Sequence, residues 1–313
     1  MPELPEVEAQ RQLLGQWAVG LEIATAVLFE QGGGPREGLF DDKVFGEEQT
    51  PATVSAALEG AHVLAARRKG KQLWLELGDA KGGTVVRSLL LHFGMTGAVV
   101  VKGAEAPLYK SFEIDTGAWP PRFTKLELIL ADRKGSMSAT LAFCDPRRFG
   151  RILIRQGATP LTSPPLSKLA ADPICDPPTV GEFGRALSRS SAPVKAVLLD
   201  QTKVVCGVGN WIADEVFYQA SVLPSTRCDS LSQVHVYVYS TCTTIAILSP
   251  YASHTPHSQY YCYYYCYTTM PILSPYASHT SHSHFIMIIR PYPFCLHMPH
   301  ARPILSAHLR TRS

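Results

Sequence analysis

Residues 124–155 read TKLELILADRKGSMSATLAFCDPRRFGRILIR, a succession of apolar runs broken by an Asp-Arg-Lys-Gly turn and by an Asp-Pro turn. Runs rich in Val, Ile, Leu and aromatic residues, bounded by Gly, Asp and Pro, are typical of β-strands. Earlier runs of the same kind occupy residues 22–29, 62–77, 84–101 and 111–114. Together they predict an antiparallel sandwich or barrel.

A helix is expected ahead of the strands. Pro5 suits the first turn of a helix, and Glu6 and Glu8 favour the positive end of its dipole. An apolar stripe continues to Gly20 through Val7, Leu13, Leu14 and Trp17. The chain therefore opens with a long helix that precedes the sheet.

A second, helical module is expected after the strands. Residues 156–178 are rich in Pro and Ser and are interpreted as a linker. Thr179 and Glu182 form a capping box for a helix that ends at Ser188, and further helices are predicted over residues 192–201 and 210–221. The predicted class is α+β, with a sandwich domain over 1–155 and helices over 179–232.

Residues 233–313 differ from the rest of the chain. They contain no Lys, Asp or Glu, and ILSPYASHT at Ile247 recurs letter for letter at Ile272. Exact repetition of polar letters is not what a solenoid shows. We interpret this tail as translated non-coding or frame-shifted sequence, with a genuine low-complexity segment as the alternative; in neither case is a folded domain expected.

The amino terminus offers a reactive group. Removal of Met1 gives Pro2 a free secondary amine, which is partly neutral at pH 7 and can attack a sugar carbon to form an iminium. Glu3 is placed to protonate a leaving group, and Glu6 lies one helical turn further on. The alternative interpretation is an ordinary acidic helix start.

Three loops suit contact with nucleic acid, although the net charge is only +3. Arg67, Arg68, Lys69 and Lys71 form a basic cluster that binds phosphate or is a solvated strand edge. FCDPRRFG (143–150) and HFGMTG (92–97) present cations, a ring and a methionine that suit insertion into a duplex, with core filling as the alternative for Met95. VCGVGN (205–210) resembles a phosphate turn before a helix that Asn210 is expected to cap; a helix before it excludes a dinucleotide fold.

In order along the chain, MPELPEVE, RRKGKQLWLEL, LHFGMTG, DPRRFG and LLDQTKVVCGVGNWIADEVFYQA closely resemble the formamidopyrimidine-DNA glycosylase family, NWIADE most like its plant and algal branch. The resemblance covers residues 1 to about 232 and implies a helix-two-turns-helix module after the sandwich.

The resemblance also implies site roles and a reaction. Pro2 is the Schiff-base nucleophile, Glu3 the general acid/base, Glu6 a supporting carboxylate and Lys71 a phosphate contact near the catalytic site. DNA-binding residues are Met95, Arg147 and Phe149, which fill the void after base flipping, with Arg148 and Asn210. The implied reaction is excision of oxidised purines such as 8-oxoguanine and formamidopyrimidines, followed by β,δ-elimination.

The sequence departs from the family where a C-terminal finger is expected. Cys262 and Cys266 have no second pair at finger spacing, so no zinc or other cofactor is expected. A catalytically impaired DNA-binding remnant from a mis-spliced or misannotated gene is therefore one alternative. An endonuclease VIII-like enzyme for oxidised pyrimidines is another, which Leu4 and the intact DPRRFG disfavour.

The remaining expectations concern partners and compartment. The partner is damaged double-stranded DNA, the protein is expected to be a monomer, and no apolar run approaches the length that a membrane helix needs. The start of the chain lacks the pattern of a secretory signal, so an intracellular location is expected, in the nucleus first and an organelle second.

Overall fold

The computed structural model describes residues 2–79, 83–105, 114, 117–233 and 235–236. These residues all belong to the first of two compact units, Met1–Cys262 and Tyr263–Ser313. The tail predicted to be unfolded and its Cys262 and Cys266 lie outside the described residues.

The opening helix α1 spans Leu4–Trp17, as the sequence predicted. Glu3 is its N-cap, and a capping box joins Glu3 to Glu6: the backbone N–H of Glu3 donates to the Glu6 carboxylate over 3.0 Å. The helix buries Leu4, Val7 and Leu14 and lies against β2, β3 and β5 of the sheet. The catalytic candidates therefore sit at the fixed end of a packed helix.

Eight strands form one antiparallel sheet in the order β5-β7-β6-β1-β2-β3-β4-β8. Their bounds are β1 Glu22–Val27, β2 His62–Lys69, β3 Gln72–Gly78, β4 Val85–His92, β5 Ala98–Val101, β6 Thr124–Ala131, β7 Met137–Cys144 and β8 Arg151–Gln156. The predicted runs 62–77 and 84–101 each divide into two strands at a Gly-containing turn, and the stretch 138–155 does so at the Asp-Pro turn. Of the run 111–114, only Ile114 lies among the described residues, and it is not in a strand.

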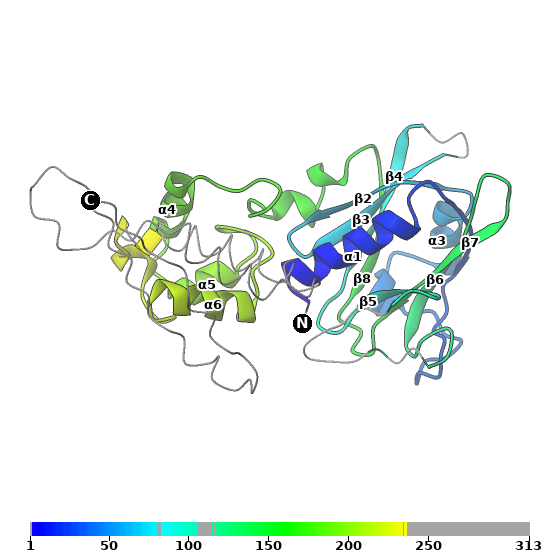
Figure 1. Cartoon of the computed structure of the whole chain (residues 1–313), viewed down its shortest axis with the longest axis horizontal. Coiled ribbons are helices and arrows are strands. Elements are labelled where there is room, and N and C mark those ends of the chain that lie inside the picture. The colour runs from blue at the N-terminus through cyan, green and yellow to red at the C-terminus, as the bar shows by residue number, and fades with distance from the viewer. Residues whose placement is uncertain (1, 80–82, 106–113, 115–116, 234, 237–313) are drawn as a thin grey trace, which may run out of the picture. The chain divides into compact units, whose positions relative to one another are not determined.

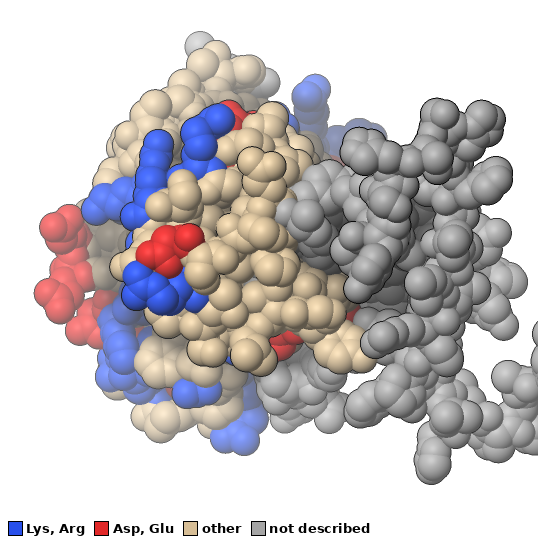
Figure 2. Space-filling view, turned by 90° about the vertical axis from the view of Figure 1, so that its left-hand side faces the viewer, with Lys and Arg blue, Asp and Glu red and all other residues tan. Residues whose placement is uncertain are grey.

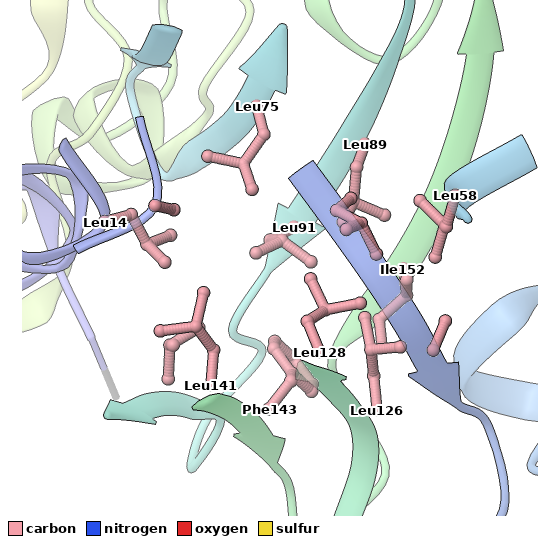
Figure 3. Packing of buried hydrophobic residues seen from close by; sticks show 14 of the residues in the cluster. Leu14, Leu58, Leu75, Leu89, Leu91, Leu126, Leu128, Leu141, Phe143 and Ile152 are labelled. Atoms are coloured by element: carbon pink, nitrogen blue, oxygen red, sulfur yellow. The ribbon is translucent and has the colours of Figure 1, made fainter. Parts of the chain in front are cut away.

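The sheet folds over so that its two halves face each other, which confirms the predicted sandwich. Leu75, Leu89 and Leu91 of β3 and β4 lie opposite Leu128 of β6 and Leu141 of β7 in the buried core (Figure 3). Strand β1 joins the halves by pairing with β6 on one side and with β2 on the other. Burial of these side chains is the main term that stabilises the domain.

Two short helices between β1 and β2 were not predicted. They are α2, Asp42–Phe45, and α3, Pro51–Leu58. Thr50 caps α3 and is followed by Pro51, which is a helix-start signal in the sequence. Buried Val44 and Phe45 fix α2 to the core, so the backbone around Asp41 and Asp42 is held in place.

The segment predicted as a linker packs tightly. It contains the 3-10 turns η1, Pro160–Thr162, and η2, Leu166–Lys168. Leu166 packs on Trp74 and Leu90 on the outer face of the sheet. The segment thus joins the two modules while packing on the sheet. Its Pro- and Ser-rich composition did not predict this packing.

The helical module contains α4 Val180–Ser188, α5 Val194–Leu199, α6 Asn210–Ala220 and the 3-10 turn η3 Cys228–Ser230 (Figure 1). The predicted Thr179–Glu182 capping box is present. The predicted cap of α6 is wrong: Gly209 is the N-cap and Asn210 is the first helical residue. No helix in the described part of the chain is long and apolar enough to cross a membrane.

The facing-halves arrangement makes a prediction about strand β7. Leu141→Ala should lower the free energy of unfolding by about 2–5 kcal/mol, because it removes buried methyl groups and leaves a cavity. Met137→Ala on the same strand, where the side chain is 73% exposed, should change it by less than about 0.5 kcal/mol. Urea unfolding of the full chain measures both, and equal effects would contradict this description of the core.

Candidate active site

The Glu3 carboxylate lies at the amino end of α6. It accepts backbone N–H groups from Gly209 at 2.8 Å, Trp211 at 3.0 Å and Ile212 at 3.2 Å. The first N–H groups of a helix have no partner within the helix, and the helix dipole favours a negative charge there. Glu3 supplies that charge from more than 200 residues away in the sequence, and its side chain is buried.

Two glycines make this approach possible. A Cβ at Gly209 would lie 2.2 Å from the Glu3 carboxyl carbon, and a Cβ at Gly207 would lie 2.3 Å from the Leu4 side chain. Gly207 also has a φ of +96°, in the left-handed region that other residues rarely adopt. The Gly-x-Gly turn thus brings its backbone to a carboxylate of the protein itself.

Gln201 holds the turn in shape. Its Oε1 accepts the N–H of Gly207 at 2.8 Å, and its Nε2 donates to the carbonyl oxygens of Val208 at 2.9 Å and Leu199 at 2.8 Å. The N–H of Leu4 donates to the carbonyl of Gly207 over 3.2 Å. The start of α1 and the turn before α6 are therefore one hydrogen-bonded unit.

Burial raises the pKa of Glu3 above its usual value, and the N–H donors of α6 and the nearby Lys71 ammonium oppose this rise. Burial likewise lowers the pKa of Lys71, opposed by the carboxylates of Glu3 and Glu6. The structure therefore brings Glu3, Glu6 and Lys71 close together. A carboxyl group with a raised pKa is suited to deliver a proton near neutral pH.

Pro2 is buried and directly precedes the Glu3 N-cap. Its nitrogen is an amide while Met1 is attached and becomes a secondary amine when Met1 is removed. The amine would then lie one residue from a carboxyl group that three helix N–H groups hold in place. A free amine next to a fixed carboxyl group is the combination that nucleophilic catalysis with proton transfer requires.

His92 was not predicted from the sequence to be a site residue. It ends β4 opposite Gln72, the residue after Lys71. Burial, with the charges of Lys71 and Arg151, lowers its pKa to about 4, so the imidazole is neutral at pH 7. Its Nδ1 accepts the N–H of Gly94 at 3.3 Å, which leaves Nε2 as the protonated donor. A histidine at a strand end before a glycine turn was the available signal.

The basic cluster at the end of β2 contains residues with different roles. Arg68 is buried, and its guanidinium donates to Asp172 at 2.5 Å and to Glu8 of α1 at 2.9 Å. Asp172 also accepts the N–H of Gly70 at 2.7 Å. Arg68 is thus neither a phosphate ligand nor a solvated edge residue; it joins α1, the β2–β3 turn and the segment that leads to the helices.

The loops that carry Met95 and Phe149 are adjacent. A Cβ at Gly94 would lie 2.4 Å from the carbonyl carbon of Phe149, so the two backbones touch. The buried Asp145 carboxylate accepts from Thr96 Oγ1 at 3.0 Å, from the N–H of Arg147 at 3.2 Å and from the N–H of Gly150 at 2.6 Å. One carboxylate therefore orders both loops.

The predicted inserting side chains are exposed on these loops. Met95 is 37% and Phe149 42% exposed, and the Arg147 guanidinium lies 5.0 Å from the Phe149 ring centre. Arg148 differs from its neighbour, because its guanidinium is bound to Asp41. Asn210 is exposed in the first turn of α6, beside the Glu3 carboxylate.

Charge on the face formed by the helical end of the described residues is mixed. Figure 2 shows Lys and Arg side chains with Asp and Glu among them. This agrees with the small net charge of +3. Local clusters rather than a uniform field would then supply any phosphate contacts. Within the described ranges, no group of three or more His, Cys, Asp or Glu could hold a metal ion.

Comparison with known proteins gives two family matches. Residues 1–152 match the formamidopyrimidine-DNA glycosylase N-terminal domain, and residues 169–248 match the formamidopyrimidine-DNA glycosylase H2TH domain. A formamidopyrimidine-DNA glycosylase of Arabidopsis thaliana is 36% identical over 234 residues, which are 74% of this chain and 54% of that protein. One from Corynebacterium glutamicum strain R is 32% identical over 241 residues, 74% of this chain and 72% of that protein.

Solved structures agree. The MutM (Fpg) protein from Thermus thermophilus is 28% identical with a TM-score of 0.57, over 78% of this chain and 74% of that one. A Lactococcus lactis Fpg variant bound to Fapy-dG-containing DNA is 25% identical with a TM-score of 0.59, over 78% of this chain and 77% of that one. This chain spans about half the length of the Arabidopsis relative.

The buried Arg68–Asp172 pair makes a pH-dependent prediction. Asp172→Asn should lower the free energy of unfolding at neutral pH by about 3–5 kcal/mol, because it removes one of the two carboxylates that neutralise the buried Arg68 guanidinium and leaves only Glu8. Burial alone would raise the pKa of Asp172, but Arg68 outweighs it, so that pKa lies below the ordinary value. The stabilisation is therefore complete above the ordinary pKa and is lost as the pH falls through the lower, folded-state pKa.

Urea unfolding from pH 7 downward measures this effect. The difference between wild type and Asp172→Asn should be constant to about pH 4 and shrink below it. Asp176→Asn, an exposed carboxylate in the same segment, is the control and should change stability little. A difference between wild type and Asp172→Asn that grows on acidification would contradict the account.

Proposed function

Because the chain belongs to the formamidopyrimidine-DNA glycosylase family, we propose that it is a DNA glycosylase and AP lyase of base-excision repair that acts through the amine of Pro2. The proposed substrates are 8-oxoguanine and formamidopyrimidine lesions in double-stranded DNA. The proposed setting is the nucleus, with a DNA-containing organelle as the alternative, since the substrate is DNA.

The observation that carries the proposal is the Glu3 carboxyl group next to Pro2. Three N–H groups at the amino end of α6 hold this carboxyl group in one position, one residue after the nitrogen at the chain start. Burial raises the pKa of Glu3 and so increases its protonated fraction near neutral pH. Orientation together with this pKa is what a general acid needs.

The proposed chemistry consists of base displacement, opening of the sugar ring and two eliminations. The lone pair of the Pro2 nitrogen forms a bond to C1′, and the bond to the base breaks as the base takes up a proton from Glu3. The nitrogen loses its proton, and the sugar ring opens with a proton added to its oxygen, which leaves an iminium. The iminium draws electrons when C2′ loses a proton, so the 3′ phosphate departs, and a second elimination releases the 5′ phosphate.

DNA contacts are proposed for exposed and half-buried groups around this centre. Lys71 and Asn210 are proposed to bind phosphates, Lys71 beside Glu3 and Asn210 at the end of a helix. Met95, Arg147 and Phe149 are proposed to enter the space that an extruded base leaves. A flexible thioether, a cation and a ring on touching loops have suitable shapes for that space.

Borohydride trapping of the full chain on a duplex with 8-oxoguanine opposite cytosine tests the proposal. We expect a covalent adduct that depends on the lesion, and peptide mapping should locate it on Pro2. A chain with a non-removable N-terminal extension, which blocks the amine, should give none, and Pro2→Gly should give less because its amine is primary.

Other outcomes favour the competing functions. An adduct on Lys71 instead of Pro2 would contradict the proposed nucleophile. Efficient trapping only on an oxidised-pyrimidine duplex would favour the endonuclease VIII-like alternative. No adduct from a folded chain would favour the catalytically impaired remnant.

A further inference from the structure

A cluster of charged side chains lies on the side of the sandwich that carries loop 145–150, and Arg36 lies at its edge, 3.9 Å from Asp41. Glu30, Asp41 and Lys125 are each about 98% or more buried. Lys125 is bound to Glu30 and lies 3.2 Å from Asp41. The Arg148 guanidinium completes the cluster, with Nε and Nη2 donating to the two Asp41 oxygens, both over 2.8 Å.

Such a cluster is costly to bury and is maintained only when every partner is present. Asp41 is fixed from within by Lys125 and by its place directly before α2, whose Val44 and Phe45 are in the core. Two parallel charge-assisted hydrogen bonds define the orientation of a guanidinium as well as its position. Asp41 is therefore a rigid anchor for the loop.

The loop needs an anchor because of its backbone. Arg148 has a φ of +57°, in the left-handed region that a residue with a Cβ adopts only when its surroundings require it. Asp145 fixes the backbone on both sides of Arg148, at Arg147 and Gly150. Between these points, the one side chain that reaches inward to a buried carboxylate is that of Arg148.

The residues around Asp41 also hold the Phe149 ring. Lys43, two residues after Asp41 in α2, places its ammonium 5.3 Å from the ring centre, and the Arg147 guanidinium lies 5.0 Å from it. A cation near an aromatic ring is attracted to it. Asp41 thus holds Arg148, and Lys43 contacts the Phe149 ring.

We propose that Arg148 is a positioning residue and not a DNA ligand: bound to Asp41, it presents Arg147 and Phe149 in the conformation that enters the duplex. This inference rests on the proposed function. It changes the prediction made for Arg148 from sequence, which grouped both arginines of the DPRRFG motif as DNA contacts. Asp41 and Lys125, for which the sequence indicated no role, take part in positioning the same loop.

The test compares Asp41→Asn with Asp42→Asn in the full chain. Asp42 is the matched control, because it is the neighbouring carboxylate, is exposed, and lies 3.8 Å from Arg148 without a bidentate contact. We expect Asp41→Asn to slow excision of 8-oxoguanine from duplex DNA about 10- to 100-fold in single-turnover assays, as a misplaced group does. Asp42→Asn should stay within about threefold of wild type.

A second substrate separates loop position from the chemistry. On a single-stranded oligonucleotide with a preformed abasic site there is no duplex to enter, so borohydride trapping by Asp41→Asn should match wild type. The fluorescence of 2-aminopurine placed opposite the lesion should rise on binding of wild type and Asp42→Asn, and rise less with Asp41→Asn. If wild type traps neither substrate, the proposed function fails; if wild type traps both and the two Asn variants behave alike, only this inference fails.

Arg148→Gln keeps the experiment decisive if Asp41→Asn does not fold, because Asp41 then retains Lys125. Its excision rate should fall as in Asp41→Asn, and combination with Phe149→Ala should lower the rate no further than Phe149→Ala alone. For Arg148→Gln, the slope of the logarithm of the DNA-binding constant against the logarithm of the salt concentration should equal that of wild type. A slope reduced by about 0.9, with effects that add, would show that Arg148 binds a phosphate and would overturn the inference.

Discussion

The structure depends on one carboxylate, that of Glu3, which lies between two helices. The backbone N–H of Glu3 donates to Glu6 at the start of α1, and the Glu3 carboxylate accepts three N–H groups at the amino end of α6. Since Glu3 follows Pro2 directly, the interaction that joins the sandwich to the helical module also fixes the carboxyl group that is the proposed proton donor, next to the candidate nucleophile. The Glu3 carboxylate therefore both joins the two modules and forms part of the candidate site, so the site can form only when both modules are folded.

Other features of the chain serve this contact. Gly207 and Gly209 remove the side chains that would otherwise separate α6 from Glu3. Gln201 sets the shape of the turn, and the buried Arg68–Asp172 pair holds the β2–β3 turn, which carries Lys71, against the segment that leads to the helices. A buried ion pair adds little net stability but is costly to break, so it specifies one arrangement of the modules.

Local signals in the sequence were enough for much of the fold. The strand-like runs other than 111–114, the Thr179–Glu182 box and the helix at Pro5 were confirmed, because each depends on neighbours within a few residues. Long-range pairing was not predictable: Asn210 looked like a helix cap because the true acceptor, Glu3, is more than 200 residues away. In the same way Arg68 looked like surface charge until Asp172, about 100 residues on, proved to be its partner. His92, too, acquired significance only from its neighbours in space.

Amide hydrogen exchange at the amino end of α6 tests the central contact most directly. These N–H groups have no partner within the helix, so in wild type their protection must come from Glu3. In Glu3→Ala, exchange at Gly209, Trp211 and Ile212 should speed up by about 10- to 100-fold, the loss expected for hydrogen bonds to a charged group, while Val197 and Leu198 in α5 keep their protection. Unchanged exchange at the three amides would show that Glu3 does not hold α6 and would contradict the account.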